Sequence, residues 1–140
     1  MARIYVTRRE TFSAAHRLHS DKLSKEENQE LFGPCNNIHG HGHNYSIEVT
    51  VSGSPDPVTG MVINISDLKL IIKDKIMAVL DHKNIDKQVE YFRESGLVST
   101  TENLALFCWK QLEDDIPSPA RLHQVKIWET DKNIVTYNGE

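Results

Sequence analysis

Apolar and polar residues alternate along several stretches of the chain, and a period of two predicts β-strands. The clearest alternation runs through residues 43–53, where the apolar positions are Tyr45, Ile47, Val49 and Val51. A strand over these residues buries one face and exposes the other. Four further stretches, rich in β-branched and aromatic residues, predict strands at 3–12 (continuing through 13–18), 61–65, 123–129 and 134–137.

Two long helices are predicted by apolar residues at helical spacing. The first follows Ser66 or Asp67, either of which can cap a helix, and ends near residues 80–84. The second begins at 99–103, where Ser99 and Glu102 match a capping box. The apolar stripes are Leu68, Ile71, Ile72, Val79 and Leu80 in the first helix and Leu104, Phe107, Cys108 and Leu112 in the second. A short exposed helix is predicted after Ser24, which has Glu27 three residues later.

The long elements follow one another as three strands, two helices and two strands. Hairpin connections between sequential strands favour an α+β fold, in which an antiparallel sheet carries the two long helices on one face. The chain contains no linker-like segment and no internal repeat. Residues 1–140 are therefore predicted to form a single domain.

Composition narrows the class of protein. The chain has 140 residues, a formal net charge of −4 and 39% hydrophobic residues, which is typical of a globular domain. Neither the charge nor any apolar run predicts a nucleic-acid or membrane partner, because about 20 apolar residues are needed to span a bilayer. Two cysteines are too few for a disulfide framework, and the N-terminal residues lack the apolar core of a signal peptide. We therefore expect a reduced, cytoplasmic protein.

The segment CNNIHGHGHNY, residues 35–45, concentrates the titratable chemistry. His41 and His43 are two residues apart, so both point to the buried face of the strand and can converge on one metal ion. Gly42 between them allows close approach of backbone or ligand. Zinc prefers such nitrogen ligands, and His16 is the best candidate for a third ligand, with one position left open. His39 and His41 have the same spacing, so this second pair remains an alternative.

Three further positions carry possible chemistry. Cys35 lies beside the proposed cation, which would lower its pKa and make it a base or nucleophile, although a small core residue is the usual role of a cysteine. Asp81 and His82 would be an ordinary surface pair at the end of a helix. Glu129 has the inward parity of its strand and would need a donor partner there, unless the strand end already exposes it.

Five ordered motifs, spread over nearly the whole chain, carry a family resemblance: FSAAHRL, CNNIHGHGHNY, LDHKN, STTEN and WETDKN. Together they resemble the 6-pyruvoyl tetrahydropterin synthases, the zinc enzymes of tetrahydrobiopterin synthesis. The resemblance implies the tunnelling fold, an antiparallel four-stranded sheet with two long helices on one face. Three subunits then close their sheets into a barrel, and two such trimers stack as a homohexamer with active sites between subunits. This arrangement would cover exposed strand edges.

The resemblance also implies roles for individual residues. The zinc ligands would be His16, His41 and His43. The catalytic residues would be Cys35 as base, Asp81 and His82 as a relay, and Glu129. Glu129 would also anchor the pterin, together with Thr100 and Thr101. The substrate would be 7,8-dihydroneopterin triphosphate, and the products 6-pyruvoyl tetrahydropterin and triphosphate. No nicotinamide is implied, and a role for Mg2+ stays open.

Two alternatives also stay open. The related 6-carboxytetrahydropterin synthases resemble C-x-x-x-H-G-H. Five residues separate Cys35 from His41, which resembles the pyruvoyl enzymes, but Cys35 and His39 also have the shorter spacing. The second alternative is a non-catalytic zinc-binding protein. Structural zinc sites normally have four ligands, so three histidines favour an open catalytic site.

Overall fold

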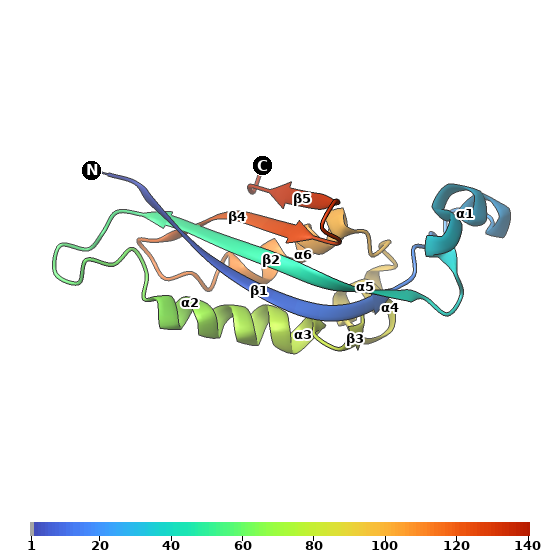
Figure 1. Cartoon of the computed structure of the whole chain (residues 1–140), viewed down its shortest axis with the longest axis horizontal. Coiled ribbons are helices and arrows are strands. Elements are labelled where there is room, and N and C mark those ends of the chain that lie inside the picture. Colours follow the sequence, from blue (N-terminus) through green and yellow to red (C-terminus); the bar gives the residue numbers. More distant parts are fainter. Residues whose placement is uncertain (1) are drawn as a thin grey trace.

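The chain forms a five-stranded sheet with helices packed against it (Figure 1). The computed structural model describes residues 2–140. The strands occur in the spatial order β3-β1-β2-β4-β5. Their bounds are β1 Ile4–His16, β2 His41–Gly53, β3 Lys83–Asn84, β4 Arg121–Trp128 and β5 Ile134–Tyr137. The two longest strands, β1 and β2, pair over their whole length and form the centre of the sheet.

The α+β class is confirmed, but the predicted four-stranded antiparallel sheet is wrong in one respect. β1, β2, β4 and β5 pair antiparallel, whereas β3 adds a fifth strand that runs parallel to β1. β3 has only two residues, paired with Ala14 and Ala15. A two-residue strand is too short to show the alternation from which strands are predicted.

The predicted strand at 61–65 is also wrong. Residues 61–64 form no strand, and α2 begins directly after them, at Ile65–Ile72. The N-cap is Asn64, whose side chain accepts a hydrogen bond from the Ser66 backbone N–H, so neither Ser66 nor Asp67 caps the helix. The helix continues through a π-helical turn, η2 Lys73–Met77, into α3 Ala78–Leu80. The stretch predicts a strand because four of its five residues are apolar, but Asn64 is the N-cap and Ile65 the first residue of α2.

The remaining helices are α1 Lys25–Phe32, the 3₁₀ turn η1 Gly33–Asn36, α4 Ile85–Gln88, α5 Glu90–Ser95 and α6 Thr101–Leu112. The capping box of Ser24 and Glu27 is confirmed at α1. At α6 the N-cap is Thr100, one residue later than predicted, and Ser99 is buried instead. Because the Thr100 carbonyl accepts the Leu104 N–H, the Ser99 carbonyl is free to accept from another partner.

The core lies between one face of the sheet and the helices. Alternate residues of β2, from Tyr45 to Val51, are buried as the sequence predicts, and so is the α6 stripe Leu104, Phe107, Cys108 and Leu112. The opposite face of the sheet carries polar pairs, such as Thr7 with Thr50 and Arg9 with Glu48. The sheet therefore has one buried and one polar face.

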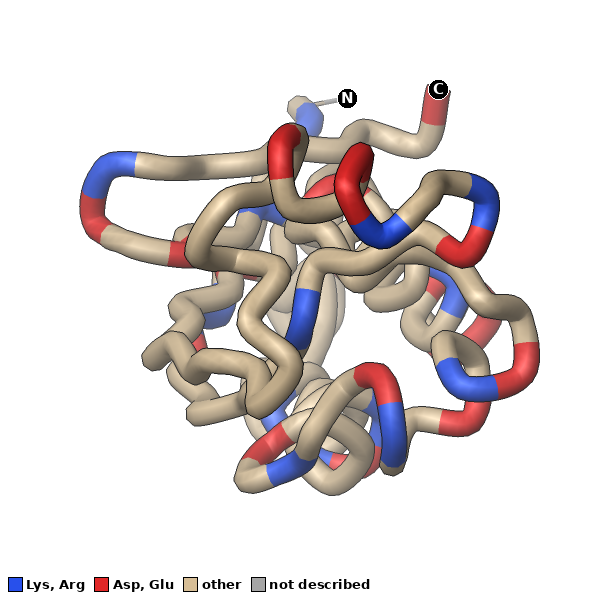
Figure 2. The backbone as a smooth tube through the Cα atoms, turned by 90° about the vertical axis from the view of Figure 1, so that its right-hand side faces the viewer, with Lys and Arg blue, Asp and Glu red and all other residues tan. Residues whose placement is uncertain are grey.

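Charged residues are dispersed over the molecule. Viewed from the end of the sheet at which α1 lies, acidic and basic residues are interspersed along the backbone (Figure 2). Among residues 2–140, no helix has the length and apolar character needed to cross a membrane.

Candidate functional site

Three histidines meet where β1 ends and β2 begins. His16 is directly opposite His41 in the antiparallel register, and His43 lies two residues further along β2 on the same face. The imidazole ring centroids are 4.6 Å apart for His16 and His41, 5.2 Å for His16 and His43, and 4.9 Å for His41 and His43. One ligand atom from each histidine lies within 4.8 Å of the other two. The strand register alone thus brings the three imidazoles together.

The histidines fit a metal ion because their inward nitrogens have no other partner. His16 Nε2, His41 Nδ1 and His43 Nε2 are buried and make no hydrogen bond to any of residues 2–140. His16 Nδ1 lies 2.7 Å from the Ser99 carbonyl oxygen, which can only accept, so Nδ1 carries the proton and Nε2 presents a lone pair. Burial lowers the pKa of both His16 and His43 and favours the neutral form that binds metals.

His39 lies outside this group. Its side chain is exposed, and its backbone N–H donates to Asn37 Oδ1 at 2.9 Å in the turn before β2. The structure therefore brings together His41 and His43 with His16, and not the alternative pair of His39 and His41. His39 has the same parity as His41 and His43, but β2 begins only at His41, so His39 stays in the turn.

The glycine that the site requires is Gly40, not Gly42. Gly40 has φ +75°, and a Cβ built on it would lie 3.0 Å from the His16 carbonyl oxygen. A Cβ on Gly42 would lie 3.5 Å from the Ala14 carbonyl oxygen, which is an ordinary contact. The tight turn at Gly40 lets the chain enter β2 directly beside the end of β1.

Glu129 lies beside the histidines. Its Oε2 accepts a hydrogen bond from Thr101 Oγ1 at 2.7 Å and lies 3.9 Å from His43 Nε2. Thr101 is the first residue of α6, so this bond joins the end of β4 to the helix layer. The donor partner that an inward carboxylate needs is therefore present, as the strand parity predicts.

A hollow of about 470 Å³ opens next to Glu129. The predicted anchor residues Thr100, Thr101 and Glu129 all line it. A second carboxylate, Glu102, lines it too, although the sequence suggested only a capping role for Glu102. Lys132 and Asn133 from the β4–β5 turn complete its polar wall.

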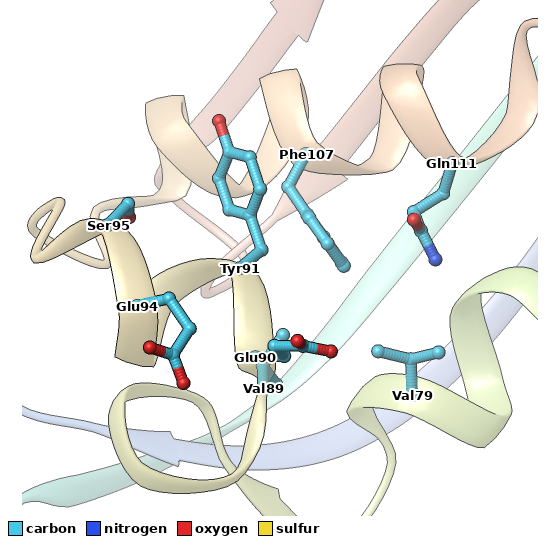
Figure 3. Close-up of a pocket in the computed structure, with 8 residues that line it drawn as sticks. All are labelled: Val79, Val89, Glu90, Tyr91, Glu94, Ser95, Phe107 and Gln111. Carbon is cyan, nitrogen blue, oxygen red and sulfur yellow. The ribbon is translucent and has the colours of Figure 1, made fainter.

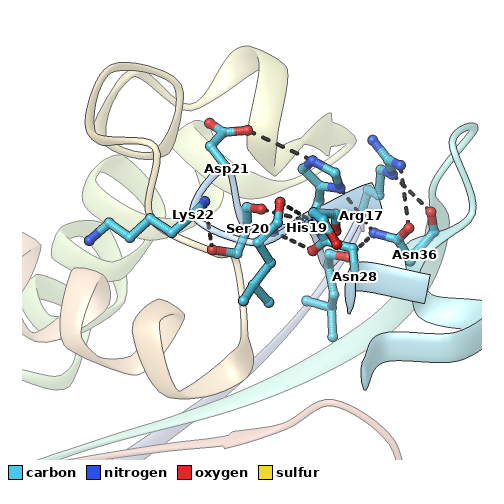
Figure 4. A network of polar contacts seen from close by, with 10 residues as sticks. Arg17, His19, Ser20, Asp21, Lys22, Asn28 and Asn36 are labelled. Atoms are coloured by element: carbon cyan, nitrogen blue, oxygen red, sulfur yellow. Dashed lines mark hydrogen bonds and ion pairs between the residues drawn. The ribbon is translucent and has the colours of Figure 1, made fainter. Parts of the chain in front are cut away.

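Cys35 lies in η1, and a polar network holds this turn against the segment after β1. The Leu18 N–H donates to the Cys35 carbonyl at 2.9 Å, and Arg17 Nε donates to the Asn36 carbonyl at 2.9 Å. Asn36 Nδ2 in turn donates to the Leu18 carbonyl at 2.7 Å (Figure 4). The thiol itself is half-buried and makes no hydrogen bond among residues 2–140. Asn36, which sequence reasoning passed over, thus fixes the position of Cys35.

Asp81 and His82 form a pair at the edge of β1. Asp81 Oδ1 lies 3.0 Å from His82 Nδ1 and also accepts from the Ser13 N–H at 3.0 Å. The Ser13 bond is the main reason why the Asp81 pKa is lowered, so the carboxyl is ionised. The His82 side chain is 82% exposed. Within residues 2–140, no hydrogen bond or ion pair joins this pair to Cys35 or to the three histidines.

Comparison with known proteins decides the family. The family model described as 6-pyruvoyl tetrahydropterin synthase matches residues 5–140, which is nearly the whole chain. The chain belongs to the 6-pyruvoyl tetrahydropterin synthase family. The resemblance carried by the five motifs is confirmed.

Members of the 6-pyruvoyl tetrahydropterin synthase family in animals are similar over almost their full length. The 6-pyruvoyl tetrahydrobiopterin synthase of Poecilia reticulata is 57% identical over 136 residues, which cover 97% of this chain and 90% of that protein. The human protein of the same name is 55% identical, with 96% and 91% covered. The structure of 6-pyruvoyl tetrahydropterin synthase from Caenorhabditis elegans superimposes with a TM-score of 0.92 at 46% identity and covers 100% of this chain and 98% of that one.

Replacement of Gly40 by Ala should disturb the histidine site. Gly60 is a matched control, because it has φ +74° and no atom within 4 Å of a built Cβ. Both variants carry the strain of a left-handed non-glycine residue, about 1–2 kcal/mol, but only Gly40→Ala also clashes with the His16 carbonyl. We expect Gly40→Ala to lose more unfolding free energy in urea and to bind Zn2+ or Co2+ more weakly than Gly60→Ala. Equal stability and equal metal affinity of the two variants would contradict the role of Gly40.

Proposed function

We propose that the chain catalyses the zinc-dependent conversion of 7,8-dihydroneopterin triphosphate to 6-pyruvoyl tetrahydropterin and triphosphate, in tetrahydrobiopterin biosynthesis. The observation that carries this proposal is the group of three buried, unpartnered imidazole nitrogens next to a hollow lined by Thr101 and Glu129. Family membership supports it, since relatives more than 50% identical bear the corresponding name.

Zinc is the metal that suits the donor set. Three imidazoles hold Zn2+ at about 2.0–2.1 Å and leave a fourth position for substrate oxygen, whereas Mg2+ prefers oxygen ligands in octahedral geometry. Mg2+ would therefore be held by the triphosphate and not by His16, His41 or His43. When bound, the zinc acts as a Lewis acid on the side-chain oxygens and makes the neighbouring carbon-bound protons more acidic.

The proposed base is Cys35. Its thiol is half-buried and free of hydrogen bonds, so as thiolate it can take a carbon-bound proton from the substrate side chain. Asp81 holds His82 through Nδ1, which leaves His82 Nε2 for an external partner. We propose that these relay residues act with Cys35 across a subunit boundary, because no hydrogen bond or ion pair joins them within residues 2–140.

A homohexamer built from two trimeric barrels would create such boundaries. β3 pairs only with Ala14 and Ala15, and Ser13 is bonded to Asp81 and His82. Within residues 2–140, this edge of β1 therefore has no strand partner from Ile4 to Phe12. Long unpaired edges need cover, and closure of three sheets into a barrel would provide it. The reduced, cytoplasmic setting remains a prediction.

The pterin ring is assigned to the hollow next to Glu129. Its 2-amino-pyrimidinone edge offers two parallel donors, which suit one carboxylate. Glu129 is the predicted anchor, and its Oε2 lies 3.9 Å from His43 Nε2, which supports a second role next to the proposed zinc. Glu102 is then the rival acceptor on the same wall.

The reaction product tests the proposed function directly. Purified zinc-loaded protein incubated with 7,8-dihydroneopterin triphosphate should release triphosphate and form 6-pyruvoyl tetrahydropterin, identified by mass spectrometry. Formation of 6-carboxytetrahydropterin would assign the chain to the alternative activity. No turnover with zinc bound would favour a non-catalytic zinc protein.

The metal ligands are tested by a pair of histidine variants. His41→Ala removes one of three converging nitrogens and should lower the zinc content from about one per chain to nearly none, because structural and catalytic zinc sites need at least three ligands. His39→Ala is the matched control and should keep its zinc. If elemental analysis finds zinc in His41→Ala but not in His39→Ala, His39 and not His41 would be the ligand.

The Cys35→Ala variant shows whether Cys35 acts as a general base or as a zinc ligand. The loss of a general base should lower turnover by about 10²- to 10⁴-fold and leave zinc content and pterin binding intact. A Cys35→Ala protein that is purified without zinc would make Cys35 a ligand. Triphosphate release at the wild-type rate would remove Cys35 from the mechanism.

Glu129→Gln and Glu102→Gln distinguish the two carboxylates. Loss of the carboxylate that anchors the pterin leaves donors of the pterin ring unpaired. It should raise the dissociation constant of a non-reacting pterin by about tenfold or more. We expect this for Glu129→Gln, with zinc retained. Unchanged pterin affinity in Glu129→Gln, with a loss in Glu102→Gln, would transfer the anchor to Glu102.

A further inference from the structure

A second hollow lies at the end of the sheet opposite to the histidines. It has a volume of about 670 Å³ and is bordered by Arg3, Arg121 and the connection between β2 and α2. β2 runs from His41 at one end to Gly53 at the other (Figure 1). Thirteen strand residues span roughly 40 Å, so this hollow is remote from the metal site.

Two arginines flank one position of the sheet at this hollow. Arg3 Nη1 donates to Ser52 Oγ at 3.1 Å, and Ser52 pairs with Arg121 in the register of β2 and β4. Both side chains are exposed, and neither makes an ion pair among residues 2–140. Several guanidinium N–H groups are thus free for an anion, which arginine binds in a bidentate manner.

Asp56 is the one acidic residue among the described residues that line the hollow, and its carboxylate already accepts hydrogen bonds from its own loop. Asp56 Oδ1 accepts from the backbone N–H groups of Val58 and Thr59 at 2.7 and 3.0 Å. The loop is closed further by bonds between Asp56 and Met61 (2.9 Å) and between Gly60 and Asp56 (2.7 Å). The hollow is therefore preformed, which lowers the entropy lost when a ligand binds.

The rest of the wall is largely apolar. Met61 is 46% exposed, and Val62 packs so closely on Gly53 that a Cβ there would lie 3.0 Å from Val62 Cγ1. The other apolar lining residues are Pro55, Pro57, Ile63 and Pro119. An apolar wall with a few convergent polar groups, in a volume of several hundred Å³, is typical of small-molecule sites.

The hollow between α5 and α6 has the opposite charge. Glu90 and Glu94 line it together with Tyr91 and Phe107, and Figure 3 shows the two carboxylates below these aromatic side chains. Its volume, about 640 Å³, is similar. The two hollows thus differ in charge more than in size, and only the arginine-lined one is complementary to an anion.

We propose that the hollow at Arg3 and Arg121 is a second small-molecule site. Its ligand class is an organic anion, with a phosphate, sulfonate or carboxylate group between the two guanidinium groups and an apolar or aromatic body against Met61 and Val62. The site stands independently of the proposed catalytic function, because it shares no residue with the histidine site.

Methyl NMR of the full-length zinc-loaded protein, titrated with 1-naphthyl phosphate, tests this site. The methyl signals of Met61, Val62 and Ile63 should shift and saturate. Arg121→Gln should raise the dissociation constant read from these signals by about tenfold or more, because a charge-assisted hydrogen bond is lost. Arg93→Gln, which removes the same charge from an exposed position on α5, should leave it unchanged.

Two further probes separate charge from apolar contact. Inorganic phosphate and 1-naphthol should each bind more weakly than 1-naphthyl phosphate at the same methyl groups. The proposal fails if the Met61 methyl does not shift, if Arg121→Gln and Arg93→Gln have equal dissociation constants, or if either partial probe binds as tightly as the complete one.

Discussion

Three buried imidazole nitrogens without a hydrogen-bond partner are the constraint on which the structure of this site depends. A buried polar atom left unsatisfied costs about 1–3 kcal/mol, and His16, His41 and His43 each contribute one. A cation bound by these three nitrogens would remove this cost, because it would give each of them a partner. The three histidines therefore suit a metal ion, and the backbone register of β1 and β2 sets their positions.

The sheet supplies that geometry. Because His16 pairs with His41, a slip of one residue between β1 and β2 would turn one set of side chains to the other face and separate the ligands. Gly40 allows the two strands to meet at this point, and the Ser99 carbonyl fixes the His16 tautomer from the helix layer. Thr101 joins the same helix end to Glu129. Bonds from the start of α6 thus fix both His16 and Glu129, which lies beside the hollow.

Much of this arrangement could be predicted from the sequence, where the pattern was long enough. The alternation in β2 placed His41 and His43 on the buried face, and the α6 stripe identified a core helix. Short or backbone-dependent features could not be predicted: β3 has two residues, the N-cap Asn64 lies inside the apolar stretch 61–65, and Ser99 acts through its carbonyl. Whether Cys35 meets Asp81 and His82 could not be predicted either, because no local pattern links residues so far apart in the sequence.

X-ray absorption of the zinc-loaded protein tests the central claim most directly, because it reads the ligands of the ion itself. The account predicts a first shell of nitrogen and oxygen only, at about 2.0–2.1 Å, with outer-shell scattering from three imidazoles. A sulfur scatterer at about 2.3 Å would contradict it, because Cys35 would then be a ligand and the open position would be lost.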